Sequence, residues 1–480
     1  MPSKPSTRIA EPLLGGPVGI HLGVAGRRFR SAQAYVLAAV LGVTTFLALA
    51  LQGPCLNSGY EQPSASARMC SGPLSTAFAG DVNPDVLGRA HGGAAALAPL
   101  EGRLVDLLHL VTDDVSLFMV VVLLLNTAGI AALGAGLLVL ARERAWLIAA
   151  FASPLILFTL GSTLDPLALA LSVWAMVLFA GSPPVPPRGW LAGVLLGVAT
   201  FINPLALLVL LALTLAGPHP ARGLRPRNPR MMLAAATITS ALLLVIDLTA
   251  IDRIVHWYSD AVDGGSFASI LLMAELGDVS VWAPLWIIAS AGVILAVAVS
   301  LHMVRRTGLD PAVSACLLIG GCLLLAPGLM PWDSLWLLPF VALSIRRWWV
   351  LIIWTLAEAV FAISIQLGDV SGFEADKGLD PTFVALFTLL RLLALVLVVI
   401  MAGENLYRRR IRGVMVTAEP PRRGDGDGPS PDGDAPPRRE DEWSDHPAED
   451  SAPRDDPDSA SAGKEAHADE HDSAPTGRLD

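Results

Sequence analysis

Ionisable side chains gather in one long polar segment, residues 53–114, which separates the first two apolar runs of the chain. Carboxylates of such a segment can act as a general base toward a hydroxyl group, and arginines can hold a phosphate. Most loop charges are simply solvated, so the residue types alone select none of them. The ionisable residues of this segment include Glu61, Asp81, Asp85, Glu101, Asp106, Arg68, Arg89, Arg103, His91 and His109.

A second group of polar residues lies within or beside apolar runs, where polar side chains are costly and usually face the interior of a helix bundle. Glu358 and Arg391 fall on neighbouring predicted helices, and we interpret them as an ion pair in preference to a ligand site. Asp165 precedes a proline at the start of a helix, where a carboxylate can cap backbone amides; it is also a candidate site residue. The group consists of Asn126, Asp165, Asn203, Asp247, Glu358 and Arg391.

The four cysteines form two pairs along the chain. Cys55 and Cys70 lie in the first polar segment, and we expect them to form a disulfide if this segment faces an oxidising compartment. Cys316 and Cys322 lie in an apolar run and are interpreted as packing residues. No Cys/His spacing typical of a zinc site, no glycine-rich phosphate loop after a strand and no G-x-S-x-G motif occurs in the sequence.

Long apolar runs must position these residues. Hydrophobic residues make up 53% of the 480 residues, charged residues only 16%, and the mean hydropathy is +0.57, which excludes a purely soluble protein. A helix needs roughly 20 apolar residues to cross a bilayer core. We therefore predict an all-α polytopic membrane protein with about 11–12 transmembrane helices. The runs lie at about 31–52, 115–140, 145–160, 164–181, 190–216, 231–251, 281–304, 311–329, 334–345, 348–367 and 381–402.

Arginines follow alternate runs, and positively charged loops stay in the cytoplasm. We therefore predict a cytoplasmic segment at 1–30, an uncleaved first helix, an extracytoplasmic loop at 53–114 and a cytoplasmic C-terminus. A single crossing at 190–216 would export the group of four arginines that begins at Arg222. Two half-helices broken at Asn203-Pro204 would avoid this, because proline removes a backbone donor and disfavours helix in the preceding residue. One long kinked helix is the alternative.

The net charge of −10 describes no single region of the chain. Residues 414–480 contain 19 acidic and 7 basic residues, so the preceding part is nearly neutral. This tail is rich in Pro, Gly, Ser and charged residues and cannot bury enough apolar surface to offset its ordering entropy. We predict a disordered acidic cytoplasmic tail, for which a solvating role is preferred over a regulatory one.

Several short motifs occur along the chain in a fixed order. They are Pro54-Cys55, Met69-Cys70, Leu100-Glu101, Ser153-Pro154, Thr163-Leu164-Asp165, Trp190 to Gly197, Asn203-Pro204, His256-Trp257-Tyr258, Asp263 to Ser266, Leu335 to Pro339, Arg346-Arg347 and Trp354 to Glu358. In these motifs and their order the chain resembles integral-membrane glycosyltransferases of the GT-C superfamily, family 87, an actinobacterial group that includes polyprenyl-phosphate-mannose-dependent mannosyltransferases. The resemblance spans 31–405, which we treat as one polytopic domain.

The resemblance implies transfer of a sugar from a polyprenyl-phosphate carrier to an acceptor outside the cytoplasmic membrane, with inversion at the sugar carbon. It implies an acidic base in the first outer loop and basic residues that bind the carrier phosphate. The family's Cys-Tyr-Ser-Asp segment is Cys70-Ser71-Gly72-Pro73 here. A lysine expected before Pro204 is Phe201, and an expected Asn-Lys pair is Ala326-Pro327.

Because of these departures, other residues become the candidates. Glu101, Asp81 and Asp85 are alternative candidates for one general base, and Arg103 and Arg89 for the phosphate contact. Further candidates for substrate binding are Asp165, Asn203, His256 and Tyr258. The last two belong to an aromatic triplet, which we interpret first as an interfacial anchor and second as a surface for sugar stacking.

The leading expectation is a cell-envelope glycosyltransferase of the plasma membrane that transfers a sugar, with mannose as first candidate, to a lipid or glycan. One alternative is a non-catalytic relative that binds the lipid carrier or scaffolds envelope synthesis, and another is a lipid or sugar transporter. We expect membrane lipids as partners, no nucleic-acid partner, and no cofactor besides the polyprenyl-phosphate sugar donor. The sequence indicates no metal ligands.

Overall fold

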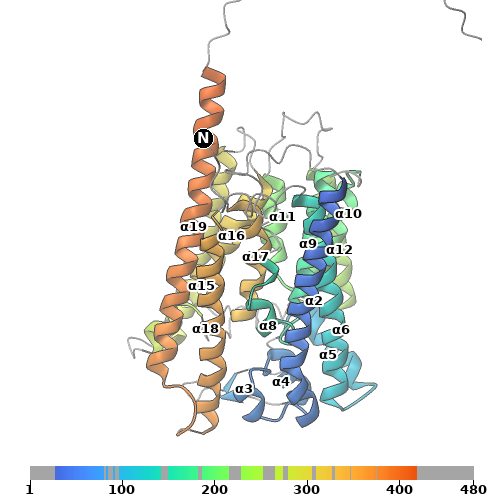
Figure 1. Ribbon diagram of the computed structural model, residues 1–480, viewed down its shortest axis with the longest axis vertical. Helices are drawn as coiled ribbons and strands as arrows, with labels where there is room; N and C mark the ends of the chain where they lie inside the picture. The colour runs from blue at the N-terminus through green and yellow to red at the C-terminus, as the bar shows by residue number, and fades with distance from the viewer. Residues whose placement is uncertain are drawn as a thin grey trace, which may run out of the picture. The chain divides into compact units, whose positions relative to one another are not determined.

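The computed structural model describes residues 27–80, 83–84, 90–91, 97–141, 150–181, 186–215, 229–251, 265–273, 279–304, 310–326, 330–345, 347–374 and 376–418. These residues form a bundle of helices (Figure 1). Within the described ranges, the only strands are two-residue segments, β1 (Asn83–Pro84) and β2 (Ala90–His91), which pair antiparallel. The prediction of an all-α polytopic membrane protein is confirmed.

The helices follow the apolar runs of the sequence in chain order. They are α2 (Arg27–Ser58), α3 (Ser64–Ala67), α4 (Pro73–Ala79), α5 (Pro99–His109), α6 (Val115–Ala141), α8 (Leu155–Thr159), α9 (Asp165–Ala180), α10 (Gly189–Ile202), α11 (Ala206–Leu215), α12 (Pro229–Ile246), α14 (Phe267–Met273), α15 (Val279–Val304), α16 (Pro311–Leu325), the 3-10 helix η4 (Pro331–Leu337), α17 (Leu338–Ser344), α18 (Trp348–Phe373) and α19 (Pro381–Ala418).

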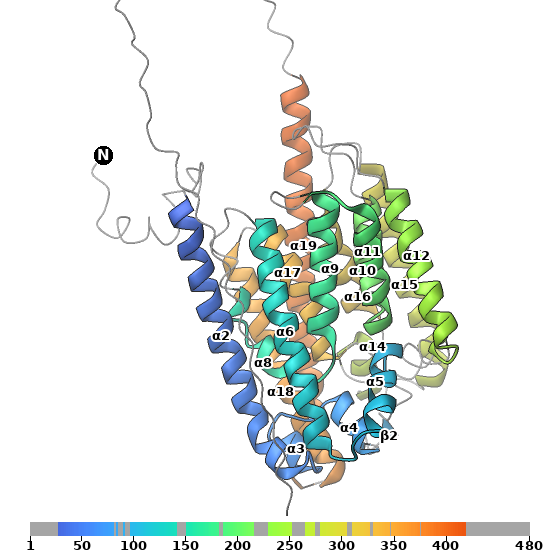
Figure 2. The ribbon, with the colours of Figure 1, turned by 90° about the vertical axis from the view of Figure 1, so that its right-hand side faces the viewer.

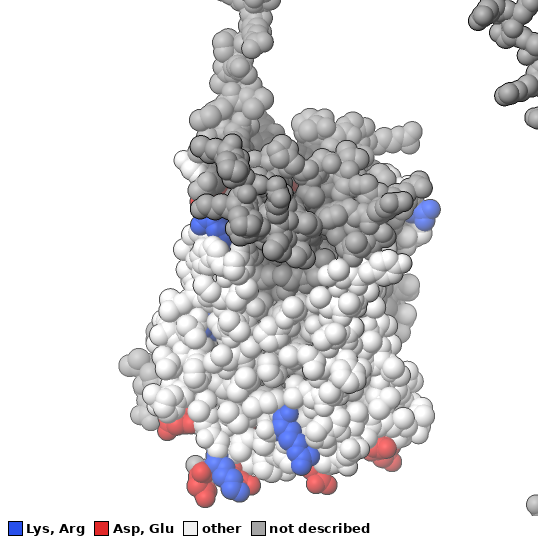
Figure 3. Space-filling model, viewed as in Figure 1, with Lys and Arg blue, Asp and Glu red and all other residues white. Residues whose placement is uncertain are grey.

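Five described helices are long and apolar enough to cross a bilayer, namely α2, α6, α12, α18 and α19. Shorter apolar helices, among them α9, α10, α11 and α16, pack between them. Large apolar side chains such as Phe46 on α2, Leu242 on α12 and Leu393 on α19 point out of the bundle and are exposed. On the face seen in Figure 3, charged side chains lie mainly near the two ends, with a largely uncharged belt between them. These outward apolar side chains form the surface that contacts membrane lipid.

The helices pack in two rows. In the first row α2 contacts α6, α6 contacts α9, α9 contacts α10, and α10 contacts α12, as Figure 2 shows from left to right. In the second row α15 contacts α16, α16 contacts α19, and α19 contacts α18. Helix α11 packs against α9 of the first row and α16 of the second. Helix α11 therefore links the two rows.

The run predicted at 190–216 is two helices, α10 and α11, as the charge argument favoured. Asn203 lies between them with extended backbone angles (φ −149°, ψ 124°). Pro204 follows and has no N–H to donate to a continuous helix, while the side-chain oxygen of Asn203 accepts a hydrogen bond of 2.8 Å from the Leu205 N–H. The break therefore exposes backbone groups that the protein interior must satisfy.

Two other predicted runs differ from the structure. The continuous helix predicted at 145–160 is wrong in its described part, because the chain leaves the helix after Phe151 and restarts as α8 at Leu155. The intervening Pro154 explains this break. The run at 334–345 begins as the 3-10 helix η4 and continues as the short helix α17, and most of its side chains are buried.

Glycines allow α10 to approach α12 closely. A Cβ atom at Gly193 would overlap the backbone oxygen of Met232, and a Cβ atom at Gly197 would lie 2.8 Å from that of Thr239. The two glycines are four residues apart and therefore share one face of α10. Small residues at this spacing let membrane helices associate through close backbone contact.

Candidate functional site

Glu101 lies in the first turn of α5, where the exposed amides and dipole of a helix favour a carboxylate. It is only 5% exposed, and its Oε1 accepts a hydrogen bond of 2.6 Å from the backbone N–H of Leu164. Burial raises the pKa of the Glu101 carboxyl, and the nearby charge of Asp165 raises it further, while the hydrogen bond from Leu164 opposes the shift. Glu101 is therefore directed into the bundle and away from bulk water.

Asp165 begins α9 and is fully buried. Its Oδ1 accepts hydrogen bonds from Asn203 Nδ2 (2.6 Å) and Trp336 Nε1 (2.9 Å). Its Oδ2 accepts a hydrogen bond of 2.7 Å from Thr163 Oγ1. The predicted helix cap is wrong, because α9 has no side-chain cap and the Asp165 carboxylate accepts from side chains instead. Asp165 thus joins α9 to the α10–α11 break and to η4.

Asn203 connects Asp165 to a third carboxylate. Its Nδ2 lies 3.4 Å from Asp333 Oδ1, and the other oxygen of Asp333 accepts a hydrogen bond of 2.9 Å from the Met330 N–H. Asp333 is buried within η4. We call Glu101, Asp165 and Asp333 the carboxylate cluster; α5, α9 and η4 each contribute one member.

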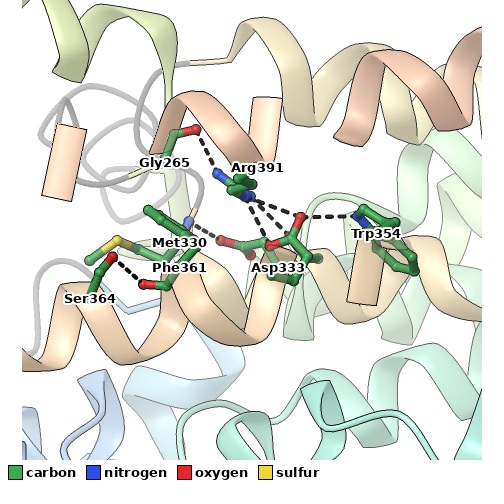
Figure 4. A network of polar contacts seen from close by, with 9 residues as sticks. Gly265, Met330, Asp333, Trp354, Phe361, Ser364 and Arg391 are labelled. Atoms are coloured by element: carbon green, nitrogen blue, oxygen red, sulfur yellow. Dashed lines mark hydrogen bonds and ion pairs between the residues drawn. The ribbon is translucent and has the colours of Figure 1, made fainter. Parts of the chain in front are cut away.

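A buried ion pair lies beside this cluster (Figure 4). Arg391 Nε of α19 lies 2.9 Å from Glu358 Oε2 of α18, and both side chains have no exposed surface. The remaining nitrogens of the guanidinium donate to the Gly265 carbonyl (2.6 Å) and to Ser334 Oγ (2.9 Å). The interpretation of Glu358 and Arg391 as an ion pair is confirmed, and Ser334 places the pair next to Asp333.

The surroundings of the ion pair favour a structural role. Trp354 Nε1 donates to Glu358 Oε1 at 3.1 Å, and the ring of Phe361 lies 4.6 Å from the Arg391 guanidinium carbon. A buried ion pair is tolerated when hydrogen bonds satisfy the remaining donors and acceptors. Arg391 thus links α18, η4 and the segment that precedes α14.

Arg103 lies apart from the carboxylate cluster. Its side chain is 45% exposed and donates to Asp247 Oδ1 at 2.5 Å and to Thr249 Oγ1 at 3.3 Å. Arg103 also lies 3.6 Å from Asp106. Because Glu101 and Arg103 are two residues apart on a helix, they point to different sides of α5. The structure therefore brings Glu101, Asp165 and Asn203 together but directs Arg103 to another surface.

The polar segment 53–114 contains a disulfide and is held against the bundle by hydrogen bonds. The predicted disulfide between Cys55 and Cys70 is formed, whereas Cys316 and Cys322 are buried free thiols. Beside the disulfide, Gln366 Nε2 of α18 donates to the Ser71 carbonyl at 2.7 Å. The Leu74 N–H donates to the Ser162 carbonyl at 3.3 Å. These contacts hold α3 and α4 against α18 and the turn before α9.

The remaining predicted site residues, Asp81, Asp85, Arg89, His256 and Tyr258, lie outside the described residues. Sequence reasoning missed Asp333 and Trp336 as parts of the site. The signal for Asp333 was an acidic residue beside an apolar run, the same signal that selected Asp165. Within the described ranges, no group of three or more His, Cys, Asp or Glu side chains is arranged to hold a metal ion.

The chain matches no protein-family model and no curated protein with which it was compared.

Proposed function

We propose that the chain is a cell-envelope glycosyltransferase that moves a sugar, with mannose as first candidate, from a polyprenyl-phosphate carrier to a lipid or glycan acceptor. The observation that carries the proposal is the position of Glu101. This residue belongs to the segment that the sequence predicts to be extracytoplasmic, and its carboxylate is buried beside Asp165. This proposal agrees with the resemblance to GT-C glycosyltransferases, in which an acidic residue of the first outer loop is the base.

In the proposed reaction Glu101 acts as the general base. Its carboxylate accepts the proton of an acceptor hydroxyl while the hydroxyl oxygen bonds to the anomeric carbon of the donor sugar. The bond from this carbon to the carrier phosphate breaks, and the polyprenyl phosphate leaves with the electron pair. A carboxyl whose pKa is raised by burial and by the charge of Asp165 is a stronger base than an exposed glutamate once it is ionised.

The same proposal includes the orientation of the chain in the plasma membrane. Arginines lie in the segments that follow alternate apolar runs, while the turn between α2 and α3 and the turn before α6 carry Glu61, Asp113 and Asp114. The distribution of positive charge favours both termini in the cytoplasm. The disulfide between Cys55 and Cys70 fits an oxidising compartment on the opposite side.

The test is transfer of labelled mannose from polyprenyl-phosphate mannose by membranes that contain the protein. Glu101→Gln removes the base but keeps an oxygen that can accept the Leu164 N–H, so transfer should fall while the protein level is unchanged. Glu61→Gln removes an exposed carboxylate of the same polar segment and is the matched control. Absence of transfer above empty membranes, with several acceptors and carrier sugars tried, would overturn the enzymatic proposal.

Two observations favour the non-catalytic alternative, in which the chain binds a lipid carrier or scaffolds envelope synthesis. Asp165 accepts hydrogen bonds with both oxygens, and the position of the family's lysine is occupied by Phe201, which is buried. A photoactivatable polyprenyl phosphate would label such a protein at a saturable site although no sugar is transferred. Saturable labelling of both the wild type and Glu101→Gln, without transfer by either, would favour this alternative.

A further inference from the structure

An apolar stripe lies on the side of α5 opposite to Glu101. Leu107 is 59% exposed, Leu110 is 83% exposed and Val111 is 76% exposed. The helical turn continues through Val111, whose N–H donates to the Leu108 carbonyl at 2.9 Å. Residues at this spacing share one helix face, and Arg103 lies on the same face one turn earlier. We call Leu107, Leu110 and Val111 the α5 stripe.

The α5 stripe is connected to the surface of α12, which contacts lipid. Arg103 reaches Asp247 and Thr249 at the end of α12, so the two helix surfaces meet there. Around these two residues the large apolar side chains Ile246 and Leu248 are exposed. Helix α12 is one of the five helices apolar and long enough to cross a bilayer, and little of its surface is buried in the protein.

We propose that α5 is a membrane-interface helix whose α5 stripe contacts the acyl chains of the bilayer leaflet that surrounds the end of α12. Large apolar side chains that remain exposed in a folded protein mark a surface for another apolar partner. An amphipathic helix can lie in the membrane interface with its apolar stripe toward the acyl chains and with charged residues, here Arg103 and Asp106, beside the stripe. Arg103 fits this position, since an arginine can place its aliphatic stem on apolar surface while its charged head stays at a polar layer.

This position gives α5 two distinct faces. One face contacts lipid through the α5 stripe, and the other directs Glu101 to the Leu164 amide and the carboxylate cluster. Part of the segment 53–114, which the sequence predicts to be an extracytoplasmic loop, then lies in the leaflet. The lipid contact does not depend on the enzymatic proposal, since it follows from the exposed side chains and from continuity with α12.

The test places single cysteines at Leu110 and Val111 in a Cys316→Ala, Cys322→Ala background, with the native disulfide intact. The purified variants are labelled with an environment-sensitive NBD fluorophore and reconstituted into phosphatidylcholine–phosphatidylglycerol vesicles. Quenching by lipids that carry a doxyl group on the acyl chain is compared with quenching by aqueous iodide. Leu242→Cys on α12 is the lipid-facing reference, and Glu61→Cys between α2 and α3 is the water-facing reference.

The proposal expects Leu110→Cys and Val111→Cys to show the strong doxyl quenching and blue-shifted emission of Leu242→Cys, with several-fold weaker iodide quenching than Glu61→Cys. Iodide quenching equal to that of Glu61→Cys, with no doxyl quenching, would overturn it and place the stripe in water. Protection from both quenchers would also overturn it, in favour of a protein partner such as a second copy of the chain. Elution of each variant as the wild type does on size exclusion controls for misfolding.

Discussion

The carboxylate of Glu101 accepts the N–H of Leu164, the residue that immediately precedes Asp165. A buried hydrogen bond thereby joins the first polar segment to the start of α9, across 63 positions of the sequence. The two carboxylates lie near one another but use different donors, because Asp165 is held by Thr163, Asn203 and Trp336. The backbone N–H of Leu164 therefore fixes the start of α9 against the first turn of α5.

Replacement of Glu101 should separate its structural role from its proposed chemical role. Glu101→Ala leaves the Leu164 N–H buried without its acceptor, and we expect a loss of stability of about 1–3 kcal/mol. Glu101→Gln retains an acceptor oxygen and should change stability by less than about 1 kcal/mol. Thermal unfolding of the two purified variants in detergent measures this difference. Equal destabilisation by both substitutions would show that the Leu164 hydrogen bond is not the important contact.

Glu101 should also make stability depend on pH. Its pKa is raised in the folded protein above the ordinary value of 4.5, chiefly by burial and then by Asp165, so the folded state binds its proton more tightly than the unfolded state. The contribution of this proton to the free energy of unfolding is fully present at pH values below the ordinary pKa of 4.5. It is lost as the pH rises through the raised pKa of the folded state. Tm measured against pH should therefore fall more steeply with rising pH for the wild type than for Glu101→Gln over this window. Parallel curves would contradict the prediction.

The Arg391–Glu358 pair should behave as a unit. Arg391→Met leaves the Glu358 carboxylate buried without its cation, for which we expect a cost of about 3–5 kcal/mol. Adding Glu358→Gln removes the uncompensated charge, so the double variant should be less destabilised than the sum of the two single variants. Denaturation of all four proteins in one detergent gives this double-mutant cycle. Additive effects would indicate that the two residues act independently.

Close contact between α10 and α12 should depend on Gly193. Gly193→Ala forces a Cβ atom against the Met232 carbonyl oxygen and the Ala235 side chain, and we expect a loss of about 1–3 kcal/mol. Gly42→Ala on α2 is the matched control, since a Cβ atom there meets nothing within 4 Å. That control should be neutral or slightly stabilising, because alanine favours helix over glycine. A Tm at Gly193→Ala equal to that of the control would refute the packing argument.

The helices were largely predictable because hydropathy and proline act locally. The break at Asn203-Pro204 follows from the missing N–H of proline together with the arginines near residue 222, and both signals are visible in the chain. Pro154 gives the same local signal for the break before α8, but this break was not predicted. The residues on both sides of Pro154 are apolar, so the run resembles a single membrane crossing. The pairing of Glu358 with Arg391 was predictable because two buried opposite charges on neighbouring helices stabilise one another.

The sequence by itself determined that the chain is a helical membrane protein, which side chains are costly to bury, and which cysteines pair. The tertiary structure decided which of the polar residues meet. Asp333 approaches Asp165 across more than 160 positions through Asn203, and Glu101 turns inward while Arg103, two residues later, turns outward. Hydropathy depends on residues close in sequence, whereas these contacts depend on how α5, α9 and η4 pack. Only that packing shows that α5 directs a carboxylate to the interior and leaves an apolar stripe on its outer side.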